Sequence, residues 1–194
     1  MHRPFALMLA AAALGLAQGC APVVIGGAAT GVTVAHDRRT AGTFVEDQTI
    51  ELKANAALRD DPDLSTQAHL NVTSFNMIVL LSGEAPSEAL RQRAGELVSN
   101  VEKVRRVHNE VLVAAPSSVM TRSSDTLITA RVKTALFGIK GMEDFDPTRV
   151  KVVTENGTVF LMGLLTRAEA DAAARAASGI GGVQRVVKLF EYQD

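Results

Sequence analysis

The sequence predicts an α+β protein in which one folding unit of about seventy residues occurs twice. Hydrophobic periodicity predicts the order helix, strand, strand, helix, strand in each unit. Three pairs of segments match in the same order: "DQTIELKANAAL" from Asp47 with "DTLITARVKTAL" from Asp125, "NVTSFNMIVLLSG" from Asn71 with "KVVTENGTVFLMG" from Lys151, and "VSNVEKVRRVHNEVLV" from Val98 with "ASGIGGVQRVVKLFEY" from Ala177. The chain is therefore expected to fold as two tandem αββαβ sandwiches.

Residues 1–19 have the features of a secretory signal peptide. Arg3 supplies the positive charge, residues 5–17 form an uncharged apolar run, and small residues follow at Ala17 and Gly19. The apolar run is too short to span a bilayer. We therefore expect export from the cytoplasm.

Cys20 is the only cysteine, so a disulfide within the chain is excluded. Three interpretations stay open: a lipidated cysteine, a free thiol left by ordinary signal cleavage, and a thiol for an intermolecular bridge. The segment resembles a bacterial lipobox, although Ala17 stands where an aliphatic residue is usual. We favour lipidation, and Ala21 at the next position favours the outer membrane by analogy with other lipoproteins.

Composition divides the rest of the chain into tether, domain, linker and domain. Residues 20–46, rich in Gly, Ala and Thr, are expected to be the lipidated N-terminus and a flexible tether. Residues 115–124, with Pro116 and four serines nearby, are expected to link domain 1 (residues 47–114) to domain 2 (residues 125–194).

The first helix of each unit is predicted from apolar residues at helical spacing. In the second unit these are Ile128, Val132 and Leu136, and Asp125 is expected to cap the N-terminus. The second helix is expected to begin near Pro86 in one unit, and in the other near Thr166, with Glu169 completing a capping box.

The two strands of each unit are predicted to form a hairpin. Asn156 and Gly157 suit the positive backbone angles of a type I′ turn. Met77 follows Asn76 at the matching place, so a different or looser turn is expected in the first unit.

The second strand of the second unit, "TVFLMGLL", is apolar on both faces. Val159 and Leu161 alternate with Phe160, Met162 and Leu164, and the helices of the unit can cover only one of these faces. We expect the other unit or a partner protein to cover the second face.

The order of elements, with Gly83 and Gly163 at the ends of the second strands, resembles the BON domain of bacterial envelope proteins. Together with the lipobox-like cysteine and the tether phrase "DRRTAGTFVEDQTIE", it is similar to the dual-BON-domain outer-membrane lipoproteins of the DolP type, which are related to OsmY-like BON proteins. The resemblance implies an α/β sandwich per unit, no catalysis, binding to anionic phospholipid and support of envelope integrity.

No constellation of residues typical of a catalytic, metal or cofactor site stands out. His69 and His108 lie in predicted strands without the short spacings of metal ligands, so no metal and no cofactor are expected. "RDDPDLS" from Arg59 is interpreted as a solvated turn, and "GIGG" from Gly179 as a helix stop. The net charge of −1 disfavours nucleic acid as a partner.

The predicted binding surface is the outer side of the first helix of the second unit. The resemblance implies contact between this helix and phospholipid, and the side away from the predicted core carries apolar and basic side chains. The candidate residues are Leu127, Arg131, Lys133, Thr134, Phe137 and Gly138. The expected protein is a non-catalytic, lipid-anchored lipoprotein on the periplasmic face of the outer membrane, which binds a phosphatidylglycerol-like membrane. The alternative is an adaptor that docks on an outer-membrane assembly factor or a cell-wall regulator.

Overall fold

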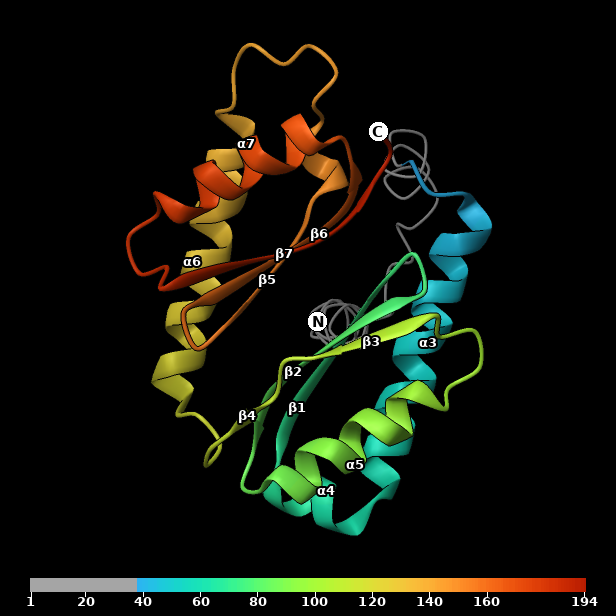
Figure 1. Ribbon diagram of the computed structural model, residues 1–194. Helices are drawn as coiled ribbons and strands as arrows, with labels where there is room; N and C mark the ends of the chain where they lie inside the picture. The colour runs from blue at the N-terminus through green and yellow to red at the C-terminus, as the bar shows by residue number, and fades with distance from the viewer. Residues whose placement is uncertain (1–37) are drawn as a thin grey trace, which may run out of the picture. The chain divides into compact units, whose positions relative to one another are not determined.

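The computed structural model describes residues 38–194. The predicted signal peptide, Cys20 and most of the predicted tether lie outside the described residues. Domain 1 contains α3 (Ala41–Asp60), α4 (Pro62–Gln67), β1 (His69–Phe75), β2 (Ile78–Ala85), α5 (Glu88–Ser99), β3 (Arg106–Asn109) and β4 (Leu112–Val113). Domain 2 contains α6 (Val119–Phe137), a 3-10 turn (Pro147–Arg149), β5 (Lys151–Glu155), β6 (Thr158–Leu165), α7 (Arg167–Ser178) and β7 (Arg185–Tyr192). This is the predicted α+β element order, repeated twice (Figure 1).

The two sheets have the same topology. In each, a hairpin pairs two strands antiparallel, and the chain then returns through a helix to place a parallel strand on the other side of the central strand. The central strands are therefore β2 and β6, and every residue of β2 is buried. In domain 1 the closing strand is divided into β3 and β4, both of which pair with β2.

Both long helices begin earlier in the chain than the sequence predicted. Thr40 accepts a hydrogen bond from the Thr43 amide, and α3 starts at Ala41, inside the predicted tether. Ser118 caps α6 in the same way, so that α6 starts at Val119, inside the predicted linker. Small polar residues that resemble a linker by composition thus supply the caps and first turns of helices.

Asp125 is not the N-cap of α6, contrary to the sequence prediction. It lies in the second turn of that helix, is buried, and accepts hydrogen bonds from the amides of Asn156 and Gly157, both at 2.9 Å. Its carboxylate therefore holds the β5–β6 turn from a neighbouring element. The turn itself is confirmed as left-handed at both central residues, with φ of 48° and 71°.

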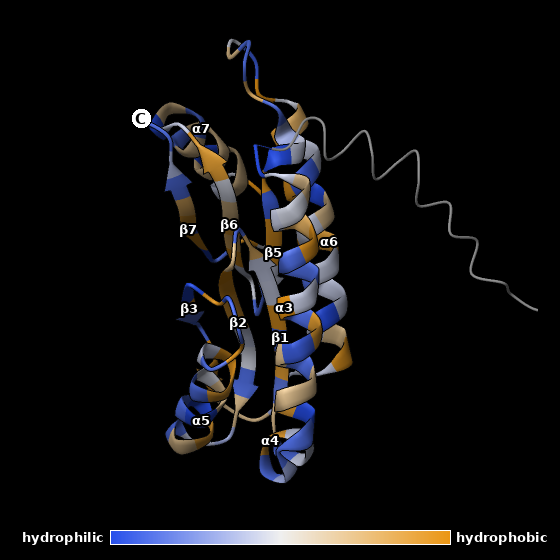
Figure 2. Cartoon of the chain, turned by 90° about the vertical axis from the view of Figure 1, so that its right-hand side faces the viewer, coloured by the Kyte–Doolittle hydropathy of each residue, from blue (hydrophilic) through white to orange (hydrophobic). Residues whose placement is uncertain are grey.

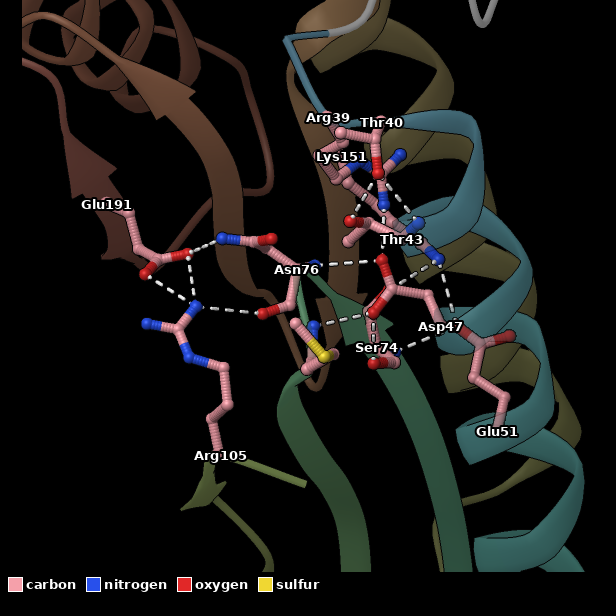
Figure 3. A network of polar contacts seen from close by, with 11 residues as sticks. Arg39, Thr40, Thr43, Asp47, Glu51, Ser74, Asn76, Arg105, Lys151 and Glu191 are labelled. Atoms are coloured by element: carbon pink, nitrogen blue, oxygen red, sulfur yellow. Dashed lines mark hydrogen bonds and ion pairs between the residues drawn. The ribbon is translucent and has the colours of Figure 1, made fainter. Parts of the chain in front are cut away.

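The matching turn of domain 1 is also left-handed, although the sequence predicted a different geometry there. Asn76 and Met77 have φ of 53° and 61°. Buried Asp47 accepts hydrogen bonds from the amides of both residues at 2.8 and 2.7 Å, and from the Ser74 hydroxyl at 2.7 Å (Figure 3). Three hydrogen bonds to the Asp47 carboxylate therefore stabilise a turn in which Met77 adopts the left-handed conformation, which is unfavourable for methionine.

The "RDDPDLS" segment is a helix rather than a solvated turn. Asp61 is buried and accepts hydrogen bonds from the amides of Asp63 and Leu64, and Pro62 occupies the first position of α4. Leu64 is thereby directed into the core of domain 1. The predicted capping box at Thr166 and Glu169 and the helix stop at Gly179 are both confirmed.

Gly83 and Gly163 lie inside their strands rather than at the strand ends. A Cβ on Gly83 would lie 2.0 Å from the His69 carbonyl oxygen, and its φ is +117°. A Cβ on Gly163 would lie 2.9 Å from the carbonyl oxygen of Arg149. Both positions need glycine because another backbone segment approaches closely.

Each domain has its own core, and the two sheets share a third. Val159 and Leu161 pack under α6 and α7, whereas Phe160 and Met162, on the other face of β6, pack with Phe75 and Leu80 of domain 1. The sequence prediction that the other unit covers the second face of this strand is confirmed. In Figure 2 much of β6 is orange, the colour of hydrophobic residues.

Candidate functional site

The outer face of α6 is formed by the residues that the helix leaves outside the domain core. The buried side carries Ile128, Val132 and Leu136. The six residues proposed from the sequence as the binding surface are all exposed: Leu127, Arg131, Lys133, Thr134, Phe137 and Gly138. Two of them are large apolar side chains, with Leu127 58% and Phe137 68% exposed.

The structure adds two residues that the sequence analysis missed. Val119 and Met120 in the first turn of α6 are 71% and 83% exposed. At 100° per residue, Met120 falls within about 20° of Leu127 and Arg131 around the helix axis. The apolar strip therefore extends to the N-terminal end of the helix. It was overlooked because the helix was expected to begin at Asp125.

The structure separates the two basic residues of the proposed surface. Lys133 lies about 160° from Arg131 around the helix axis. It lines a hollow of about 270 Å³ together with Arg39, Phe44 and Asp47 of domain 1. Lys133 therefore does not reinforce the charge of Arg131 on the strip that contains Leu127. Thr134 lies on that strip, and its hydroxyl donates to the Ala130 carbonyl of its own helix.

The charge of α6 differs from that of the equivalent helix α3. The only acid of α6 is Asp125, which is buried, whereas Arg122, Arg131 and Lys133 make no ion pair with any described residue. On α3, Lys53 pairs with Glu102 at 2.9 Å, and Glu46 pairs with Lys103 at 2.7 Å. The strip that contains Leu127 therefore has one uncompensated positive charge, that of Arg131, and much of the charge on α3 is neutralised locally.

Exposed apolar residues also occur on α3. Val45 and Leu52 are 62% and 71% exposed. Exposed apolar area alone does not distinguish the two helices. The balance of charge does, because α6 carries three basic residues and one acid, whereas α3 carries two basic residues and four acids.

The described part of the chain also contains one cluster of possible metal ligands that residue spacing did not predict. His69, Glu84 and Glu155 come from three different strands. No short sequence spacing could reveal them, because sheet pairing and the contact between domains bring them together. Among residues 38–194, no helix is both long enough and apolar enough to cross a membrane.

Comparison with known proteins identifies the repeated unit. Residues 46–115 and 124–194 match the BON domain. The chain is 41% identical over 177 residues to the outer membrane lipoprotein DolP of Haemophilus influenzae, with 91% of this chain and 90% of that protein covered.

Two further relatives share most of the chain. The 21 kDa hemolysin of Actinobacillus pleuropneumoniae is 38% identical, over 80% of this chain and 79% of the relative. The osmotically-inducible protein Y of Escherichia coli K12 is 32% identical, over 75% and 72%. The chain belongs to the BON-domain family and, with two such domains in tandem, to the group that includes the outer membrane lipoprotein DolP.

Proposed function

We propose that this protein is a lipid-anchored envelope protein that binds anionic phospholipid through the outer face of α6 and supports envelope integrity without catalysis. The observation that carries the proposal is the combination, on one helix, of exposed Met120, Leu127 and Phe137 with an exposed Arg131 that no described acid neutralises. The similarity to an outer membrane lipoprotein supports an anchor at Cys20 and a place on the periplasmic face of the outer membrane.

The physical basis is the pairing of shallow apolar insertion with headgroup attraction. Leucine, methionine and phenylalanine side chains on one helix face enter the boundary between headgroups and acyl chains. Arg131 contacts headgroup phosphate, and each basic residue near an anionic surface contributes about 1 kcal/mol. Such binding is weak by itself. An anchor at Cys20 keeps the domain close to the bilayer and raises its effective concentration there.

Vesicle flotation with the full chain carrying Cys20→Ala tests the surface without the anchor. Phosphatidylglycerol vesicles should bind the protein and phosphatidylcholine vesicles should not. Leu127→Glu and Phe137→Glu should each reduce binding, because a carboxylate enters the apolar layer and repels the anionic surface. Leu52→Glu on α3 is the matched control, since Leu52 is also an exposed leucine on the equivalent helix.

Two results would overturn the proposed surface. One is undiminished binding by both folded α6 variants, and the other is an equal loss with Leu52→Glu. Failure of the parent protein to bind either kind of vesicle would favour the alternative function, an adaptor that uses the same exposed face to dock on an envelope protein.

A further inference from the structure

Three side chains that could bind a metal converge where the two domains meet. His69 and Glu84 are directly paired residues on β1 and β2 of domain 1, and Glu155 is the last residue of β5 in domain 2. One ligand atom from each of the three lies within 4.8 Å of the others. The cluster therefore combines one imidazole and two carboxylates drawn from both domains.

The imidazole nitrogen that faces the carboxylates has no hydrogen-bond partner among residues 38–194. Nδ1 of His69 is buried, and it lies 3.5 Å from Oε2 of Glu84. Two ligand atoms bonded to one tetrahedral zinc ion at about 2.0–2.1 Å are about 3.4 Å apart. The distance between Nδ1 of His69 and Oε2 of Glu84 therefore matches that between two ligands of one zinc ion.

Both carboxylates are buried, and each is oriented by polar groups. Glu84 is 1% exposed and accepts hydrogen bonds from the side-chain amide of Asn156 and from the Ser117 backbone amide. Glu155 is 6% exposed and accepts a hydrogen bond from the Asn71 side chain at 2.9 Å. Metal-ligating carboxylates are held in this way by outer hydrogen bonds, which fix their direction.

Among the described residues, Glu84 and Glu155 form no ion pair with a lysine or an arginine, and their one possible cationic partner is His69, which is charged only when protonated. Arg122 lines the adjoining hollow of about 220 Å³ with His69 and Glu155, yet it forms no ion pair with a described residue. Two buried carboxylates without a permanently charged cationic partner are costly, and a divalent cation would compensate them.

We propose that His69, Glu84 and Glu155 form a zinc site that joins the two BON domains. Nδ1 of a neutral His69 and one oxygen from each glutamate are the three protein ligands, and the hollow beside them admits water to the remaining position. The nitrogen ligand favours zinc over magnesium and calcium, which prefer oxygen ligands alone. Because the ligands come from both domains, the ion stabilises their contact.

Isothermal titration of the full chain with ZnCl₂ tests this site. The protein carries Cys20→Ala, which removes its only thiol, and is purified without a histidine tag. We expect one zinc ion per chain at this site and a thermal midpoint that rises with zinc concentration, because the ion binds the folded state. MgCl₂ should produce neither effect at the same concentration.

His69→Ala and Glu155→Gln should each weaken zinc binding by about tenfold or more. Glu155→Gln keeps the shape of the side chain and an acceptor for Asn71, so it tests the site even if His69→Ala disturbs folding. His108→Ala is the matched control, because His108 lies on β3 outside the cluster. Absence of saturable zinc binding, unchanged affinity in Glu155→Gln, or an equal loss in His108→Ala would overturn the proposal.

Discussion

The two buried aspartates that hold the hairpin turns should differ in their contribution to stability. Asp47 accepts hydrogen bonds from Ser74, Asn76 and Met77, and its carboxylate also lies 2.7 Å from a guanidinium nitrogen of Arg39 (Figure 3). From the described residues, Asp125 accepts the two amide hydrogen bonds of the β5–β6 turn and no others. Replacement of each by alanine therefore removes four interactions in one domain and two in the other.

The expected magnitudes follow from these partners. A hydrogen bond to a charged group contributes about 1.5–3 kcal/mol, so Asp125→Ala should lower the free energy of unfolding by about 3 kcal/mol. Asp47→Ala should lower it by about 5 kcal/mol, because neighbouring interactions are not fully additive.

Guanidinium unfolding at pH 7, followed by circular dichroism on the Cys20→Ala chain, measures both losses. Asp60→Ala is the control, because Asp60 is an exposed acid at the end of the same helix α3, and its change should stay within about 0.5 kcal/mol. Equal losses for Asp47→Ala and Asp125→Ala, or a loss below about 1 kcal/mol for Asp47→Ala, would refute this account of the turns.

Two further predictions concern the shared core and the response to acid. Phe160→Ala should lower the free energy of unfolding by about 3–5 kcal/mol, because Phe160 is buried in the layer between the sheets. A loss of less than about 1 kcal/mol, measured by guanidinium titration, would contradict this packing. Burial would raise the pKa of Glu169, but hydrogen bonds from Arg38 and from Thr166 outweigh it, so the pKa lies below the ordinary glutamate range. The contribution of Glu169 to the free energy of unfolding should therefore be fully present above the ordinary glutamate pKa. It should be lost as the pH falls through the lowered pKa of the folded state. Glu169→Gln should accordingly be destabilising at pH 7 and much less so at pH 3, and an equal effect at both pH values would count against the ion pair with Arg38.

The element order and the hairpins could be predicted from sequence because they depend on local periodicity. Apolar spacing placed Ile128, Val132 and Leu136 on the buried side of a helix, and alternation on β6 correctly required a second covering layer. The helix starts were misplaced because Thr40 and Ser118 are typical of both loops and N-caps.

Interactions between segments far apart in the chain could not be predicted. Asp47 and Asp125 sit inside helices at positions that suggest nothing about a turn some thirty residues away, yet their carboxylates determine how the Asn76 and Asn156 turns are held. The cluster around His69 depends on strand pairing and on the contact between domains.

Part of the candidate site was accessible from sequence. Angular position on a helix correctly separated Leu127 and Arg131 from the core, because the period of an α-helix is fixed. The same rule would have separated Lys133 from Arg131, but Lys133 was grouped with Arg131 by charge. Val119 and Met120 were missed with the start of the helix.

The insertion of α6 into an anionic membrane can be measured directly because the chain contains no tryptophan. Leu127→Trp places a single fluorophore on the outer face of α6, and Leu52→Trp places one at a comparably exposed position on α3. With phosphatidylglycerol vesicles, the emission of Trp at position 127 should shift to shorter wavelength, because the indole leaves water for the boundary between headgroups and acyl chains. Emission from position 52 should stay unchanged, and phosphatidylcholine vesicles should shift neither variant. A shift at position 52 equal to that at 127, or no shift at 127 while the protein floats with the vesicles, would contradict binding through α6.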